Sequence, residues 1–310
     1  EDIESFTILK DASATAVFGT RGANGVILVN TKKGKAGKEQ INVEVNQAYS
    51  QFTQLPSFVD APTFMRMYNE GLTMRARTVQ YAEDVIQKHA SGEDPDLYPN
   101  VDWMNETIKN NAPITSLNIS SSGGNKVAHY YVSLGYLKNS GIYKNTESND
   151  GYSTNSSLDR LNFRSNIDVN ILNDLTLKLN LGGQVNDLNA PRMATSDIWN
   201  RLYDYPTHLF PVYAQAGLLG GTAAFPDNPA GYINSRGYKE THNRFFQSDL
   251  DLKYDAGKFI KGLDIGARVG FDNYYTVTDG WSKTFSVYQT SKDPLTGKPI
   301  VGAAIGNSTN

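Results

Sequence analysis

The sequence from residue 159 to residue 186 reads DRLNFRSNIDVNILNDLTLKLNLGGQVN, and it decides the fold. Apolar residues stand at alternate positions on both sides of a short break at 172–174. Arginine, asparagine, aspartate, lysine and threonine occupy most of the positions between them. A period of two places neighbouring side chains on opposite faces of a β-strand. The segment therefore predicts a long β-hairpin with one apolar and one strongly polar face. The apolar positions are Leu161, Phe163, Ile167, Val169, Ile171, Leu175, Leu177, Leu179, Leu181 and Val185.

The same alternation recurs along most of the chain. The further strands are predicted near 41–49, 115–122, 127–138, 246–254 and 263–271. Short turns and long connections follow these strands in strict alternation, and the long connections lie at about 54–113, 139–158 and 188–243. Spanning strands of about 9–11 residues, with short turns at one rim and long loops at the other, are typical of outer-membrane barrels. The sequence therefore predicts an all-β fold, a transmembrane antiparallel β-barrel of which about seven strands are present.

Composition and motifs exclude several other classes of protein. The 29 basic and 32 acidic residues leave no basic field that would attract nucleic acid. The chain has no cysteine, so disulfides and thiolate metal sites are excluded. The four histidines show no metal-ligand spacing, and the carboxylates of 93–103 lack the glycine and the final glutamate of an EF-hand. No nucleophile stands beside a base. We therefore expect neither enzymatic activity nor a cofactor nor a bound metal.

The long connections carry helices and aromatic residues. Residues 60–76 and 195–206 have apolar positions at helical spacing, with Asp60 as the expected N-cap of the first helix and Pro206 ending the second. Aromatic rings in these loops suit stacking on sugars or peptides equally well. The candidate contacts for a substrate or for a protein lid are Trp103, Trp199, Tyr203, Tyr205 and Tyr232. On the strands, four carboxylates are predicted to line the lumen: Asp159, Asp168, Asp249 and Asp251.

The glycine-rich stretch near the N-terminus first suggests a phosphate-binding loop. In such a loop the glycines follow a strand and precede a lysine and a hydroxyl residue. Here Gly19, Gly22 and Gly25 come before the strand at 26–29, and no serine or threonine follows Gly34-Lys35. Nucleotide binding is therefore excluded, and the glycines are expected to allow tight turns and close backbone approach.

Residues 3–35, IESFTILKDASATAVFGTRGANGVILVNTKKGK, resemble the end of the plug domain of TonB-dependent outer-membrane transporters. The resemblance is to the SusC/RagA-like branch, the nutrient importers of Bacteroidota. Further matches are Asp102-Trp103, 121–124 and 160–164. The positions that carry the plug motif are Lys10, Asp11, Gly19, Arg21, Gly22, Asn24 and Gly25.

This resemblance implies a domain organisation and a function. Residues 1–38 would be the C-terminal part of a plug domain, and 39–310 the first part of a barrel of about 22 strands, so the chain would be a segment of a longer protein. The implied activity is TonB-dependent import of an oligosaccharide or oligopeptide across the outer membrane, with a SusD-like surface lipoprotein as lid. The implied TonB-binding region is absent from this segment. The alternatives are a siderophore or cobalamin receptor and a soluble β-rich binding module.

Overall fold

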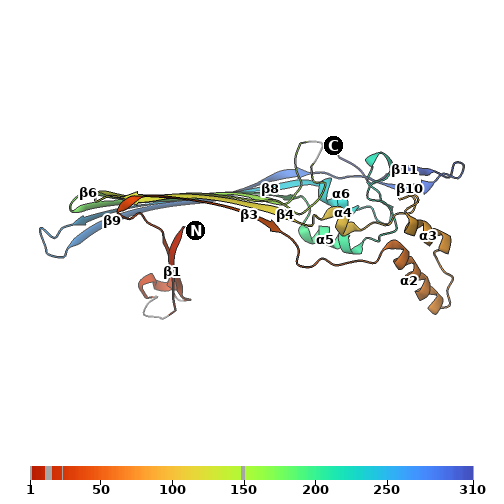
Figure 1. The fold of residues 1–310 in the computed structure, drawn as a ribbon, viewed down its shortest axis with the longest axis horizontal. Coiled ribbons are helices and arrows are strands. Elements are labelled where there is room, and N and C mark those ends of the chain that lie inside the picture. The colour runs from red at the N-terminus through yellow and green to blue at the C-terminus, as the bar shows by residue number, and fades with distance from the viewer. Residues whose placement is uncertain (1, 11–15, 23, 148–150, 310) are drawn as a thin grey trace.

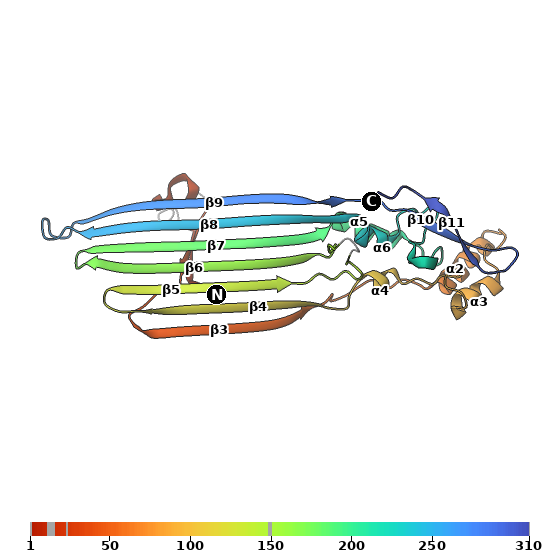
Figure 2. The ribbon, with the colours of Figure 1, turned by 90° about the horizontal axis from the view of Figure 1, so that it is seen from above.

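The computed structural model describes residues 2–10, 16–22, 24–147 and 151–309. Its centre is a seven-stranded antiparallel sheet in which every strand pairs with its neighbour in sequence, from β3 to β9 (Figure 2). This confirms the predicted all-β antiparallel architecture. Within the described residues the two outermost strands do not pair with each other, so the sheet is an open wall and not a closed barrel. The strands are β3 (Gly37–Ser50), β4 (Ala112–Gly124), β5 (Ala128–Asn139), β6 (Ser157–Leu172), β7 (Leu175–Pro191), β8 (Gly237–Asp255) and β9 (Asp264–Ser282).

The two ends of the sheet differ. Short turns at 125–127, 173–174 and 256–263 join strands at one end, and the helices gather at the other (Figure 2). The last of the three long connections, 192–236, is shorter than the predicted 188–243, because β7 and β8 continue past their alternating apolar positions. The helices are α2 (Ala61–Met74), α3 (Glu83–Ser91), α4 (Trp103–Thr107), α5 (Thr195–Asp204), α6 (Pro229–Asn234) and the 3-10 turn η2 (Gln215–Gly217).

The two helices predicted in the loops are confirmed as α2 and α5. Asp60 is the N-cap of α2, and its carboxylate accepts a hydrogen bond of 2.9 Å from the Thr63 amide. A carboxylate there satisfies an amide that has no partner inside the helix. Helix α5 ends just before Pro206, as predicted. None of the helices in the described part of the chain has the length and apolarity that a membrane crossing needs.

Two small hairpins accompany the sheet. Strands β1 (Ile3–Leu9) and β2 (Val26–Thr31) pair antiparallel and are joined through the 3-10 segment η1 (Ala16–Gly22). This N-terminal hairpin projects from one face of the sheet (Figure 1). Strands β10 (Val287–Lys292) and β11 (Pro299–Ile305) form a second hairpin at the helical end.

The strand register gives the sheet two chemically distinct faces. Ile167 lies opposite Leu179, which in turn lies opposite Leu250, so the apolar positions of adjacent strands form one continuous surface. The other surface is polar and faces the N-terminal hairpin. One prediction from the sequence is wrong: Asp159 does not lie on the polar face. It stands two residues before Leu161 and opposite Asp187, so it shares the apolar face, beyond its hydrocarbon-rich part.

A hydrophobic core of the molecule lies among the loops at the helical end. Eight buried apolar side chains from three long connections contact one another there. The sheet has no such core, because its faces are covered only by the N-terminal hairpin and by the loop body at one end (Figure 1). The members of the loop core are Trp103, Met104, Ile108, Tyr143, Ile198, Leu202, Phe210 and Ile233.

Candidate functional site

The N-terminal hairpin is held on the polar face by a few polar contacts. Asn166 of β6 donates its side-chain N–H to the Lys32 carbonyl at 2.6 Å and to the Thr31 hydroxyl at 3.3 Å. Tyr131 of β5 donates its hydroxyl hydrogen to the Asp2 carboxylate at 2.8 Å. These bonds link the start and the end of the hairpin to two neighbouring strands. The hairpin is therefore seated on the sheet through groups that water can also satisfy.

The backbone of the segment that follows the hairpin also lies very close to the sheet. At Gly34 an added Cβ would lie 2.3 Å from the Tyr130 amide nitrogen and 2.4 Å from the Tyr130 carbonyl oxygen, both backbone atoms of β5. A side chain at this position has no room, because the conflicting atoms belong to a strand that is paired on both sides. The segment between β2 and β3 therefore crosses the sheet at a point that accepts only glycine.

A polar cavity of about 360 Å³ lies between the N-terminal hairpin and the sheet. Charged groups from both parts line it, including Asp2 and Lys32 from the hairpin side and Glu44 and Arg160 from the strands. Serine and asparagine side chains of β4 and β6 complete the lining. The cavity therefore resembles a hydrated compartment between two surfaces more than a closed ligand pocket.

Two of the three glycines of the predicted plug motif have backbone conformations that favour glycine. Gly19 has φ of 60° and ψ of −149°, and Gly25 has φ of 95°, both disfavoured for other residues. Gly22 is buried, whereas Lys10 and Asn24 are exposed. Asp11 lies outside the described residues, as does the side chain of Arg21. Gly19 and Gly25 therefore help to shape the connection between β1 and β2.

At the other end, three connections merge into one body. The connections 51–111, 140–156 and 192–236 all contribute to the shared core, with Trp103 near its centre. The Trp103 indole packs 5.6 Å from the Phe210 ring and donates its N–H to the Pro206 carbonyl at 3.4 Å. The long loops are thus a single packed assembly, which we call the loop assembly.

A charged network stabilises the part of the loop assembly around α6. The Asp227 carboxylate pairs with Arg201 at 3.2 Å and with Arg236 at 3.0 Å. Both guanidinium groups lie over the Tyr232 ring, at 4.4 and 4.8 Å from its centroid. Burial, together with the nearby Asp227 carboxylate, raises the pKa of Tyr205 to about 12. Tyr205 therefore stays neutral at physiological pH.

A second cavity, of about 380 Å³, opens on the loop assembly between α2 and α5 and is mostly apolar. The Phe58 and Tyr203 rings meet edge to face at 5.8 Å and are each about half exposed. Trp103 and Tyr205 form part of the lining, and three carboxylates lie at the cavity: Asp60, Asp102 and Asp204. A concave apolar surface with a few polar groups is typical of ligand-binding sites.

The structure brings together only part of the aromatic set predicted from the sequence. Trp103, Tyr203 and Tyr205 line the apolar cavity, and Trp199 packs 6.0 Å from Tyr203. Tyr232 is buried next to Arg201 and does not line this cavity. Trp103 is also buried, so it supports the cavity wall more than it offers a free ring. Sequence reasoning missed Phe58 and Phe64, although both stand beside the recognised N-cap at Asp60.

The fold and the position of the N-terminal hairpin define a class of protein. The wall of long strands has an apolar face on one side and, on the other, a polar face with a seated hairpin. These are the features of a transmembrane β-barrel that holds a plug.

Comparison with known proteins gives the branch of that class. The chain is 33% identical over 287 residues to TonB-dependent receptor P3 of Formosa agariphila, covering 89% of this chain and 25% of that protein. It is 36% identical over 143 residues to TonB-dependent receptor SusC of Bacteroides thetaiotaomicron, covering 46% of this chain and 13% of SusC. No family model matches the chain.

Solved structures show the same fold. The RagAB peptide importer in its closed-closed state superposes with a TM-score of 0.68 at 22% identity, over 90% of this chain and 33% of the other. The chain is thus similar in sequence and fold to a segment of SusC-like TonB-dependent receptors, which are outer-membrane β-barrel proteins. It spans about a quarter or less of the length of the curated relatives it matches.

Proposed function

We propose that this chain is part of a TonB-dependent importer that carries an oligosaccharide or oligopeptide across the bacterial outer membrane. The observation that carries the proposal is the seat of the N-terminal hairpin. A motif typical of a plug lies on the polar face of a barrel wall, in the same chain and within hydrogen-bond distance of it. The partners would be TonB, acting through a region outside this chain, and a SusD-like surface lipoprotein.

The proposed division places the plug at 1–38 and the barrel at 39–310. The seat of the plug has the chemistry that reversible movement needs. Its hydrogen bonds, from Asn166 and Tyr131, are to groups that exchange readily with water, so their rupture costs little net free energy. The close approach at Gly34 limits where the connecting segment lies when the plug is in place. Energised withdrawal of the plug would then open the polar cavity into a path for the nutrient.

The substrate would first meet the apolar cavity of the loop assembly. The half-exposed Phe58 and Tyr203 rings offer flat apolar surface to a sugar ring or to a peptide side chain. Neighbouring carboxylates can accept hydrogen bonds from hydroxyl or amide groups. The names of SusC and of the RagAB peptide importer favour this class of nutrient over a siderophore or cobalamin. The relatives are named as receptors and importers, which supports transport without catalysis.

Uptake by the full-length transporter in its native host tests the proposal. Cells that lack the transporter gene, and cells that lack TonB, should both lose uptake of one labelled oligosaccharide or oligopeptide. The paired variant Phe58→Ala/Tyr203→Ala should reduce that uptake at normal surface expression. The matched control is Met74→Ala, since Met74 is exposed on α2 outside the cavity. Loss of only siderophore or cobalamin uptake would establish the alternative, and unchanged uptake of all these nutrients would overturn the proposal.

A further inference from the structure

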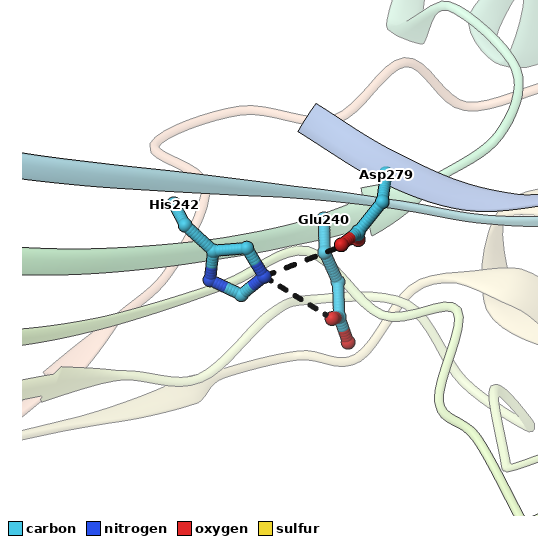
Figure 3. A group of neighbouring side chains, drawn as sticks. All are labelled: Glu240, His242 and Asp279. Carbon is cyan, nitrogen blue, oxygen red and sulfur yellow. Dashed lines mark ion pairs between the residues drawn. The ribbon is translucent and has the colours of Figure 1, made fainter. Parts of the chain in front are cut away.

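Three possible metal ligands converge at the helical end of β8 and β9, and none of them lines the two cavities described above. Glu240 and His242 stand two residues apart on β8, so their side chains leave the same face of the strand. Asp279 of β9 is the register partner of Glu240. Figure 3 shows the three side chains pointing toward a common space. They lie on the face opposite the plug, beyond the hydrocarbon-rich positions of the wall.

The distances among these groups suit an ion better than direct hydrogen bonds. His242 Nε2 lies 3.6 Å from a Glu240 oxygen and 3.9 Å from an Asp279 oxygen, and the three ligand atoms lie within 4.8 Å of one another. Hydrogen bonds between such atoms have lengths near 2.9 Å. Ligands about 2.1 Å from a tetrahedral Zn²⁺ stand about 3.4 Å apart. Small side-chain rotations would therefore bring all three ligands onto one ion.

A fourth residue orients the imidazole. His242 Nδ1 lies 2.6 Å from the Asp187 carboxylate of β7, which is also 2.6 Å from Arg244. When Nδ1 carries the proton and donates it to Asp187, the lone pair of Nε2 points toward Glu240 and Asp279. A carboxylate that fixes the histidine tautomer in this way is the usual outer support of a metal ligand.

The local charge also favours a divalent cation. Three carboxylates, those of Asp187, Glu240 and Asp279, surround one guanidinium and one imidazole. With the imidazole neutral, two negative charges remain without compensation inside the group. One divalent ion would neutralise them, and an imidazole ligand selects zinc over magnesium or calcium.

We propose that Glu240, His242 and Asp279 bind a divalent transition-metal ion, Zn²⁺ foremost, on the outer face of the barrel wall. The Asp279 side chain is 60% exposed, so the ion can enter from solvent and keep a water as its fourth ligand. The bound ion would link β8 to β9 at a place outside the transport path. It does not depend on the proposed function, because its ligands face away from the plug and from both cavities.

The test uses the purified full-length protein in detergent, stripped with a chelator and titrated with ZnCl₂ by calorimetry. One equivalent of zinc should bind, and equal concentrations of MgCl₂ or CaCl₂ should not displace it. Glu240→Gln/Asp279→Asn should abolish binding, and Asp187→Asn should weaken it by about 10–100-fold. The matched control is Asp264→Asn, an exposed carboxylate at the other end of β9 that pairs with Lys253.

The outcomes separate a metal site from a simple network of ion pairs. Zinc binding that is lost in the double variant and kept in Asp264→Asn supports the site. Absence of zinc binding in the unmodified protein overturns it. Equal binding by the double variant also overturns it, because the zinc would then be held elsewhere. Heat-dependent mobility on gels confirms that each variant is folded, and the single variant Asp279→Asn provides a milder test if the double variant does not fold.

Discussion

Gly34 is a point of close backbone approach between the segment that follows the hairpin and the sheet. The backbone of the connecting segment passes so near to Tyr130 that even a methyl group would collide with the Tyr130 amide and carbonyl. Paired strands on both sides of β5 prevent it from moving aside. Hydrogen bonds at Asp2, Thr31 and Lys32 hold the hairpin in place, and the lack of space at Gly34 restricts the path of the segment that follows.

Gly34→Ala should therefore destabilise the full-length protein by about 1–3 kcal/mol, the usual cost of overpacking. The measurement is thermal or denaturant unfolding in detergent. Gly71→Ala is the matched control, because Gly71 lies inside α2 with nothing within 4 Å of an added Cβ. That control should raise the free energy of unfolding by about 0.5–1 kcal/mol through helix propensity. A Gly34 variant that behaves like the Gly71 variant would contradict the close approach.

The candidate metal ligands show which contacts between residues cannot be predicted from a single sequence. The order Glu240-Thr241-His242 places two ligands on one face of a strand, which the sequence alone reveals once a strand is assumed. The third ligand, Asp279, and the supporting Asp187 come from neighbouring strands. Their positions depend on the register between strands, which no spacing along the chain records. The sequence therefore indicated no metal spacing among the histidines.

At the scale of the strands, the sequence predicts where the strands lie but underestimates their length toward the loops. The prediction ended β8 at 246 on the loop side, whereas the strand begins at Gly237. The alternation that marks a strand comes from hydrocarbon on its outer face. Beyond the hydrocarbon, both faces of the strand meet water, so Glu240, His242 and Asp187 replace apolar residues while the backbone pairing continues. The pattern disappears there although the strand does not.

The face assignment itself predicts different tolerance of charge at adjacent residues. Leu179 shares the apolar face with Ile167 and Leu250, whereas Asn180 points to the polar face. Leu179→Lys should lower the free energy of unfolding in lipid by about 2–4 kcal/mol if the residue lies near the midplane. Asn180→Lys is the matched control and should cost much less. Reversible denaturant unfolding in vesicles measures both, and equal losses would show that the faces are assigned wrongly.

The contact between α2 and the residues after α5 should be sensitive to acid. His208 is buried between Phe64, whose ring stacks at 4.8 Å, and Tyr81, whose hydroxyl lies 3.0 Å from Nε2. Burial lowers the pKa of His208 from its ordinary value of 6.5 to about 4. Between these two pH values the unfolded chain binds a proton that the folded chain does not. Stability is therefore complete above pH 6.5 and falls as the pH drops toward 4.

At pH 5 the loss should be about 2 kcal/mol for the local opening of this contact. Hydrogen exchange of the α2 amides at pH 7 and pH 5, corrected for the intrinsic rate, measures it. His208→Gln should remove most of the dependence on pH. The pKa of His89 is also lowered by burial, so a smaller slope should remain. An unchanged slope in the His208 variant would show that another group controls the opening.

At the scale of the whole molecule, the sequence predicts the separate loops but not that they pack into one body. Helices α2 and α5 were predicted from local spacing and capping, and both are present. The core that α5 shares with α4, α6 and Tyr143 of 140–156 depends on contacts between segments far apart in the chain. Periodicity reports which residues share a face of one element, not which elements share a core. For the same reason the sequence predicts several aromatic residues of the apolar cavity but not the cavity itself.

The loop assembly should unfold as a unit without the barrel wall. Trp103 is 3% exposed at the centre of the shared core, and its truncation to alanine removes packing from more than one loop at once. Trp103→Ala should cost about 3–5 kcal/mol. The wall should persist, because its strands are held by backbone pairing that does not involve this core. Limited proteolysis of the full-length protein should then cleave the loops much faster, while heat-dependent gel mobility stays unchanged.

Leu295→Ala, at a position 94% exposed in the β10–β11 hairpin, is the control and should alter neither measurement. Loops that remain protected in the Trp103 variant would mean that each loop is stable alone, and loss of the wall as well would mean that the core supports the strands.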